Sequence, residues 1–155
     1  PDVLVIDYAD LLRPINAKNE KRHDLESIYE ELRGIAQEFN LRVWTASQTN
    51  RSGLNAEVVT LEAISEAYSK CFVADFICSV SRTIDDKNNN TGRMFVAKNR
   101  FGPDGLVYPA KMDLSRVKID VLPSTGETIG EIQVNAAKQQ SEKLKERYKQ
   151  FKDGK

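Results

Sequence analysis

The sequence predicts an α/β fold with parallel strands, flanking helices and a C-terminal β-hairpin. Residues 3–6 and 41–46 are short apolar runs, which is typical of strands covered on both faces. The segment between them has the spacing of an amphipathic helix, so we expect the two strands to pair in parallel through a helical crossover. Pro103, Asp104 and Gly105 form a strong turn signal between two later strand patterns, and this predicts the hairpin.

The other elements follow in a regular order. The first helix presents one apolar face, and Asn40 is suited to end it. Its apolar positions are Leu25, Ile28, Tyr29, Leu32, Ile35, Ala36 and Phe39. Thr60 is expected to cap a short helix over residues 61–69, and residues 85–91 are expected to form a mobile loop. Later strands are expected at residues 74–80, 93–97, 106–112 and 117–122. A polar terminal helix is expected over residues 134–151.

The distribution of charge suggests two parts. We expect one domain over residues 1–133, followed by a polar, basic helix over residues 134–155. From Lys138 onward there are seven Lys or Arg and three Asp or Glu, so this tail is net +4 and the remainder of the neutral chain is net −4. A neutral chain argues against binding nucleic acid over its whole surface, but it allows a ring that gathers basic groups in a central channel. The tail is interpreted as a solvated helix face, with phosphate contact as the alternative.

The sequence predicts neither a membrane-spanning segment nor a zinc site. No apolar stretch approaches the length of a membrane span and no signal-peptide pattern opens the chain, so we expect a cytoplasmic protein. Cys71 and Cys78, with the single His23, do not form a recognisable zinc site. The simplest interpretation is a pair of buried thiols in a reducing compartment, and a disulfide is the alternative.

Asp7 directly follows the first predicted strand. Ligands gather at the carboxyl ends of parallel strands, and in nucleoside triphosphatases a carboxylate there is the Walker B residue that holds Mg²⁺. An ordinary structural Asp is the alternative. None of the eight glycines fits a Walker A loop, G-x-x-x-x-G-K-[ST], and the chain opens on Pro1. We therefore interpret the chain as the later part of an ATPase domain, beginning just upstream of its metal-binding strand.

Two further polar clusters flank predicted strands. Ser47 and Gln48 follow the second strand, and an amide there can both donate to a γ-phosphate and orient water. Lys98 and Arg100 flank the hairpin turn, where an i, i+2 pair in extended chain points to one side. A rigid turn that presents both cations outward suits a finger that enters a neighbour's phosphate site. Taken singly, each cluster could equally consist of ordinary polar residues on the surface.

Taken in order, these segments resemble the later motifs of DnaB-like replicative helicases, which are RecA-type motors of bacteria and many phages. The likeness covers about residues 1–122, and the Ser-Gln-Thr-Asn-Arg-Ser-Gly run at 47–53 is most similar to the phage branch. It implies a partial RecA-like sheet of the P-loop NTPase type. By this resemblance Asp7 is the Mg²⁺-associated Walker B aspartate and Gln48 senses the γ-phosphate. Arg100 is then the arginine finger that acts in trans, with Lys98 as its companion.

The resemblance also implies a DNA-contacting loop around residues 64–70. The candidate DNA-binding residues there are Ser65, Glu66, Ser69 and Lys70. Many family members carry Arg-Glu-Ser-Gly in this loop, and only Glu66 matches that pattern well. The hydroxyls, backbone amides and single Lys of the segment suit phosphate contacts rather than base reading.

The implied function is DNA replication by a hexameric ring that couples hydrolysis of ATP, with Mg²⁺, to movement along single-stranded DNA. A primase or a loader protein is a further implied partner, and the implied location is the cytoplasm of a bacterial or phage-infected cell. Walker A and the upstream catalytic glutamate are missing, so the isolated chain is expected to be inactive. The alternatives are a RecA- or KaiC-like ATPase with another task and a P-loop-less binding or regulatory module.

Overall fold

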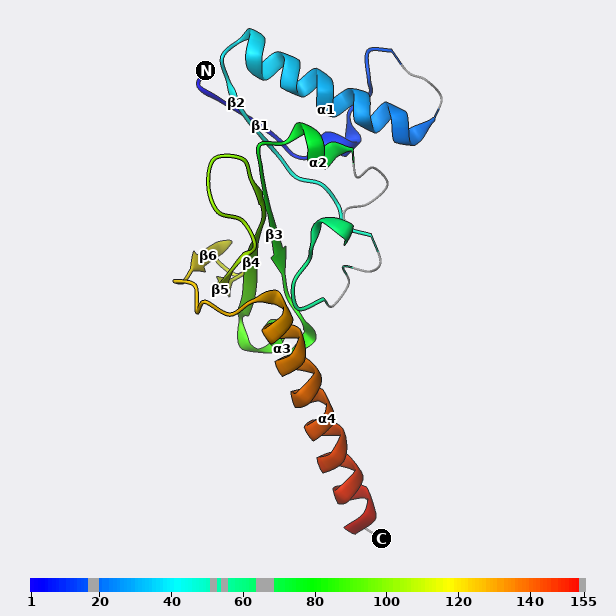
Figure 1. The fold of residues 1–155 in the computed structure, drawn as a ribbon, viewed down its shortest axis with the longest axis vertical. Coiled ribbons are helices and arrows are strands. Elements are labelled where there is room, and N and C mark those ends of the chain that lie inside the picture. Colours follow the sequence, from blue (N-terminus) through cyan, green and yellow to red (C-terminus); the bar gives the residue numbers. More distant parts are fainter. Residues whose placement is uncertain (17–19, 51–52, 54–55, 64–68, 154–155) are drawn as a thin grey trace.

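The computed structural model describes residues 1–16, 20–50, 53, 56–63 and 69–153 (Figure 1). Two sheets organise the chain: a parallel pair, β1 (Val3–Ile6) and β2 (Arg42–Thr45), and an antiparallel sheet in the order β3-β4-β5-β6. Helix α1 (Lys21–Glu38) lies along the parallel pair, and α4 (Ile129–Asp153) extends from the other end of the molecule. The mixed α/β fold expected from the sequence is confirmed.

The parallel pair and its helix form as the hydrophobic pattern predicts. Val3 is paired with Arg42 and Ile6 with Thr45, in parallel register. The apolar face of α1 packs on the short 3₁₀ helix η1 (Ala9–Leu11) and on the pair. This core consists of Ala9, Leu25, Ile28 and Leu32, with Ile6, Tyr29 and Ile35 at its edge. Because α1 returns the chain alongside β1, the residues after both strands emerge at the same end of the pair.

The other face of the parallel pair differs from the expectation of strands covered on both sides. Val3, Val5 and Trp44 are exposed there. The Trp44 ring contacts Phe76, with ring centroids 6.3 Å apart. This contact joins the parallel pair to the first strand of the antiparallel sheet.

The antiparallel sheet contains the predicted hairpin. β4 (Thr91–Asn99) pairs with β5 (Leu106–Asp113), β3 (Phe76–Ser81) pairs with the other edge of β4, and β6 (Lys118–Val121) forms the outer edge. The turn closes at Gly105, whose φ of +75° favours glycine. Phe95 and Val107 face each other across the hairpin and form a second core with Val58. The hairpin and the edge strand are therefore confirmed.

A short helix, α3 (Ile84–Asn89), replaces the mobile loop expected at residues 85–91. The prediction was wrong because the local capping chemistry outweighs the weak helix propensity of Asn and Asp. The Thr83 hydroxyl accepts from the backbone N–H of Asp86, and the Asp86 carboxylate accepts from the backbone N–H of Thr83 at 2.9 Å. Asn90 then ends the helix in the left-handed region, with φ of +54°. Asp86 also binds Arg93 at 2.8 Å, which ties α3 to β4.

The helix expected over residues 61–69 is described only at its ends. A 3₁₀ turn, η3 (Leu61–Ala63), begins it, and α2 (Lys70–Val73) follows, while residues 64–68 lie outside the described part of the chain.

Cys71 is buried, Cys78 is half-buried, and both are free thiols. Burial raises the pKa of each thiol. The alternative of a disulfide is therefore not realised.

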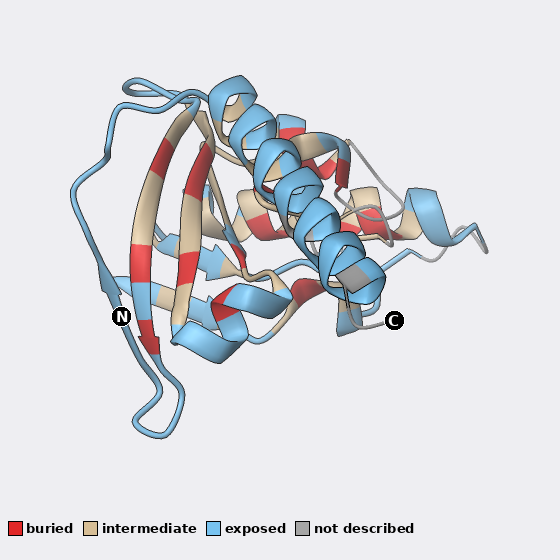
Figure 2. Ribbon diagram, turned by 90° about the horizontal axis from the view of Figure 1, so that it is seen from below, coloured by how far each residue is buried: buried red, intermediate tan, exposed pale blue. Residues whose placement is uncertain are grey.

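The terminal helix α4 begins five residues earlier than predicted, at Ile129 rather than 134. Thr128 and Glu131 cap its first turn, and Ile129 and Ile132 pack against the second core. Beyond this anchor the helix is exposed along most of its length, including the apolar side chains of Leu144, Tyr148 and Phe151 (Figure 2). The expected division after residue 133 stays a prediction, and it falls just beyond the anchor.

Removal of residues 138–155 should leave the free energy of unfolding within about 0.5 kcal/mol of the full chain, because the deleted helix makes little contact with the body. Ile132→Asp should lower it by about 1–3 kcal/mol, because it places a carboxylate in an apolar cluster. Urea unfolding of the two variants measures the difference. An equal loss in both would show that the outer part of α4 is needed for folding.

Candidate functional site

The carboxyl ends of β1 and β2 bring Asp7 and Gln48 to one edge of the parallel pair. Asp7 directly follows β1 and is exposed, and Gln48 follows β2. The Gln48 side-chain amide donates to the Tyr8 hydroxyl at 2.7 Å, so it lies beside the residue next to Asp7. Among the described residues, no hydrogen bond or ion pair engages the Asp7 carboxylate. This edge therefore presents one carboxylate and one amide to a ligand.

Thr45 fixes the turn that carries Asp7. Its hydroxyl donates to the Ile6 carbonyl at 3.0 Å and accepts from the Ala9 backbone N–H at 2.8 Å. The last residue of β2 thus holds the chain on both sides of Asp7. The position of the Asp7 carboxylate is set by backbone contacts rather than by its own side-chain bonds.

Directly behind this edge lies a polar cluster that sequence reasoning missed. The Asp10 carboxylate accepts from Lys70 and from the Tyr29 hydroxyl, both at 2.8 Å, and from Ser47 at 3.1 Å. The Lys70 ammonium also donates to Ser47 at 3.2 Å and lies 5.3 Å from the centroid of the Tyr29 ring. This Asp10–Lys70 cluster joins η1, α1, the end of β2 and α2.

Burial and hydrogen bonding oppose each other at Asp10. Burial alone would raise the pKa of its carboxyl, but the bonds from Lys70, Tyr29 and Ser47 outweigh it and lower the pKa. Burial, with the bond to Asp10, raises the pKa of Tyr29 well above its usual value. At neutral pH the Asp10 carboxyl is consequently ionised and the Tyr29 phenol is neutral.

The residues predicted to contact DNA have different placements. Ser65 and Glu66 lie outside the described residues, and Ser69 directly precedes α2. The Lys70 side chain is only 4% exposed and bonded to Asp10. Its charge is used within the chain, so the structure does not support the prediction that Lys70 faces a DNA phosphate.

The hairpin cations both contact the end of α2, and Arg100 also remains exposed at the surface. Lys98 donates to the Cys71 carbonyl at 2.6 Å and Arg100 to the Phe72 carbonyl at 3.3 Å. Arg100 also forms an ion pair with Asp75 at 2.8 Å. The last carbonyls of α2, which lack partners within the helix, accept from both side chains, while the Arg100 side chain stays 44% exposed. The role of the pair as an outward-facing finger stays a prediction.

Asn99 braces the turn between these two cations and the rest of the hairpin. Its side-chain amide donates to the Pro103 carbonyl at 3.3 Å, and its side-chain oxygen accepts from the Phe101 backbone N–H at 3.2 Å. A Cβ added to Gly102 would lie 2.8 Å from the Asn99 amide nitrogen. The close approach explains a glycine at this position.

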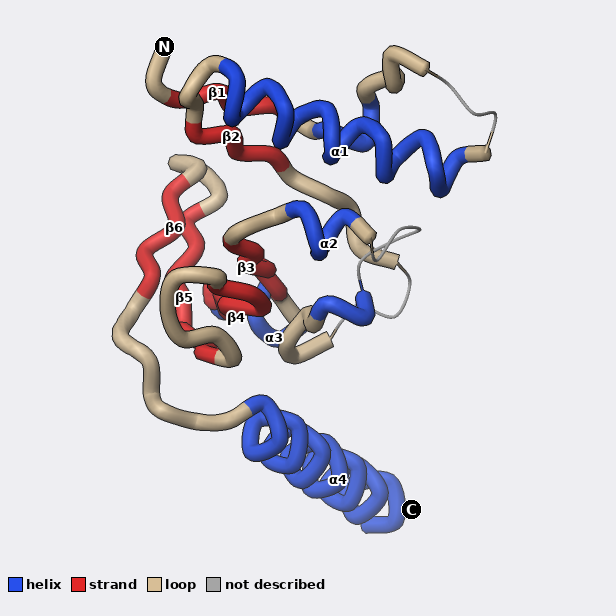
Figure 3. Tube along the Cα trace, turned by 45° about the horizontal axis from the view of Figure 1, so that its top comes forward, coloured by secondary structure: helices blue, strands red, loops and turns tan. Residues whose placement is uncertain are grey.

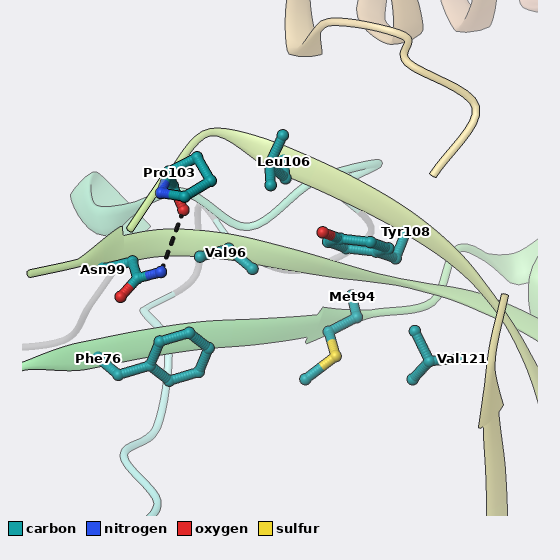
Figure 4. Close-up of a pocket in the computed structure, with 8 residues that line it drawn as sticks. All are labelled: Phe76, Met94, Val96, Asn99, Pro103, Leu106, Tyr108 and Val121. Carbon is teal, nitrogen blue, oxygen red and sulfur yellow. Dashed lines mark hydrogen bonds between the residues drawn. The ribbon is translucent and has the colours of Figure 1, made fainter. Parts of the chain in front are cut away.

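A shallow groove of about 350 Å³ lies on one face of the antiparallel sheet (Figure 4). Its walls are mainly apolar and carry no carboxylate, Lys, Arg or His side chain. The lining residues are Phe76, Met94, Val96, Asn99, Pro103, Leu106, Tyr108 and Val121. Such a surface is unsuited to phosphates, unlike the strand-end edge with its carboxylate and amide.

The donor set at that edge suits only one kind of metal site. Within the described residues, no cluster of three or more His, Cys, Asp or Glu could hold a metal ion. A single carboxylate such as Asp7 suffices where Mg²⁺ takes its other ligands from phosphate and water. The residues fit a nucleotide-bound Mg²⁺ rather than a metal held by protein alone.

A family model for the DnaB-like helicase C-terminal domain matches residues 1–115. The chain belongs to this family. The match includes the strand-end edge, α2 and the hairpin, which are the parts of the DnaB-like domain described above.

A solved structure of an ATPase domain from a phage helicase has a similar fold, with a TM-score of 0.68 and 24% sequence identity. The match covers 78% of this chain and 44% of that one, so the chain spans less than half the length of that structure. Comparison with curated proteins gives no match. None of the helices in the described part of the DnaB-like chain has the length and apolar composition needed to cross a bilayer.

Sequence reasoning assigned no polar contact to Asp10, Tyr29, Asp75 or Arg33. Tyr29 fits the apolar stripe of α1, which conceals its hydroxyl contact. Asp10 lies three residues after Asp7, beside a strand end, and this is the one local signal that could have marked it. Arg33 donates to Asp75 and to the Val73 carbonyl, which lie about 40 residues away along the chain, so no local pattern predicts those bonds.

Proposed function

We propose that the full-length protein is an ATP-driven, ring-forming DNA helicase and that this chain supplies part of its nucleotide site. The observation that carries the proposal is the meeting of Asp7 and Gln48 at the carboxyl edge of a parallel strand pair. Family membership supports the same reaction class. The chain matches only 44% of the similar solved ATPase domain, so the whole activity is proposed for the full-length protein and not for this chain alone.

Within this proposal, Asp7 orients the water shell of Mg²⁺ and Gln48 contacts the γ-phosphate or the attacking water. Mg²⁺, when bound with ATP, neutralises phosphate charge as the transferred group departs. Gln48 suits its role because an amide can donate to phosphate and accept from water. The hydrogen bond to Tyr8 keeps this amide at the edge in the absence of nucleotide.

Arg100 is proposed to act on the site of a neighbouring subunit. Its hairpin turn is braced by Asn99, and the guanidinium remains 44% exposed despite its contacts with Asp75 and Phe72. A guanidinium with five N–H donors can keep those contacts and still bind a phosphate. Lys98 is proposed to assist it. Ser65, Glu66 and Ser69 remain the proposed contacts to single-stranded DNA.

The test is hydrolysis of ATP by the full-length protein with and without single-stranded DNA, together with strand separation on a forked duplex. We expect DNA to stimulate hydrolysis and ATP to be required for separation. Asp7→Asn should raise the Mg²⁺ concentration for half-maximal hydrolysis about 10- to 100-fold, as expected for a residue that binds metal through water. Asp2→Asn, just before the same strand, is the matched control. If single-stranded DNA did not change the rate of ATP hydrolysis and no strands were separated, the result would instead favour an ATPase with another task.

A further inference from the structure

The loop between α2 and β3 contains a carboxylate, Asp75, to which the proposed function assigns no role. Asp75 lies in this loop and binds Arg100 of the hairpin at 2.8 Å and Arg33 of α1 at 3.2 Å. We propose that Asp75 is a positioning residue, which holds the Arg100 guanidinium in the direction needed to reach a neighbour's phosphates. This inference rests on the proposed function of Arg100.

Asp75 holds Arg100 at two points. The Arg100 backbone N–H donates to the Asp75 carbonyl at 2.9 Å, and the guanidinium pairs with the Asp75 carboxylate. The backbone bond fixes the position of the Arg100 main chain, and the ion pair fixes the position of the guanidinium. A long, flexible side chain is thereby restricted to one direction, and such restriction lowers the entropy cost of reaching a transition state.

Arg33 and α2 keep the Asp75–Arg100 ion pair in place. Arg33 contacts both carboxylate oxygens of Asp75 at 3.2 Å and the Val73 carbonyl at 2.7 Å. Arg100 reaches the Phe72 carbonyl from the other side. The Asp75 carboxylate is therefore anchored to α1 independently of the hairpin, which lets it serve as a fixed support for Arg100.

The same short helix also touches the strand-end edge. Lys70, its first residue, bonds to Asp10 and Ser47, and its last carbonyls receive Lys98 and Arg100. Figure 3 shows α2 between the β1–β2 pair and β3. Helix α2 thus links the position of the Arg100 side chain to the strand-end edge of the same subunit.

Because the Asp75–Arg100 ion pair is partly exposed, its role in positioning can be tested without a large effect on folding. The side chains of Asp75 and Arg100 are 41% and 44% exposed, and ion pairs this exposed contribute little to stability. A variant that loses the pair should therefore fold normally. A change in turnover would then report on the direction of Arg100.

The test compares Asp75→Asn with wild type in the full-length protein at saturating ATP. We expect kcat to fall about 10- to 100-fold, since a misplacement of about 1 Å can cost that much, with the KM for ATP and the unfolding midpoint unchanged. Asp75→Glu, which keeps the carboxylate, should recover part of kcat. Asp104→Asn, in the exposed turn of the same hairpin, is the control and should retain full kcat.

The outcomes distinguish the two proposals. Full kcat in Asp75→Asn alongside an inactive Arg100→Ala would overturn the positioning role and leave the finger intact. Full kcat in Arg100→Ala would remove the finger assignment itself. Equal losses in Asp75→Asn and Asp104→Asn, no recovery by Asp75→Glu, or a lowered unfolding midpoint in Asp75→Asn would also overturn the positioning role.

Discussion

Arg100→Ala should reduce ATP turnover by the full-length protein about 10³- to 10⁵-fold while nucleotide affinity stays nearly unchanged. A finger supplied in trans stabilises charge that develops only in the transition state, and its loss has an effect of this size. Steady-state hydrolysis gives the turnover, and equilibrium binding of a labelled nucleotide gives the affinity. Lys98→Ala should show the same pattern with a smaller loss.

Arg116→Ala is the control for Arg100→Ala. Arg116 is 78% exposed, its ion pair with Asp113 is long at 4.0 Å, and it lies outside the hairpin turn. Mixing Arg100→Ala subunits with subunits defective in Walker A should restore some activity, because certain interfaces then combine an intact finger with an intact site. Failure at every mixing ratio would argue against action in trans.

Lys70→Met should lower the free energy of unfolding by about 3–5 kcal/mol, because it leaves the Asp10 carboxylate, which is only 15% exposed, without its buried cation. Chemical denaturation of the 155-residue chain measures this loss. Lys118→Met is the matched control, since Lys118 makes an ion pair of the same 2.8 Å length with Asp120 but is 61% exposed. Its effect should stay within about 0.5 kcal/mol. Comparable losses in both variants would show that burial does not decide the strength of the Asp10–Lys70 pair.

The pH dependence of stability should follow from the lowered pKa of Asp10. With the folded-state pKa below the unfolded value, the contribution of Asp10 is complete above about pH 4. It is lost as the pH falls further and the unfolded state takes up the proton first. In Lys70→Met the burial of Asp10 is no longer offset by Lys70, so the deficit relative to wild type should narrow in acid. Denaturation at pH 3 and at pH 7 tests this sign.

Local patterns in the sequence were sufficient for much of the fold. The period of α1, the apolar runs of β1 and β2 and the turn chemistry around Gly105 each act over a few residues, and the structure contains the elements they predict. The strand-end location of Asp7 and Gln48 followed from the same patterns. Their functional roles remain proposals. The helix α3 was missed because its stability comes from side-chain caps at Thr83 and Asp86 rather than from propensity.

Read alone, the sequence determined which residues stand at strand ends and in the hairpin turn, because strand, helix and turn preferences are short-range. Only the tertiary structure decided which charges meet. Lys70 and Asp10 are 60 residues apart along the chain, and Arg100 meets Asp75 because their neighbours Asn99 and Phe76 pair between β4 and β3. An ion pair forms where the fold brings the two charges within contact distance. No local pattern encodes that condition, so the partners of Lys70 and Arg100 within the chain could not be predicted from the sequence.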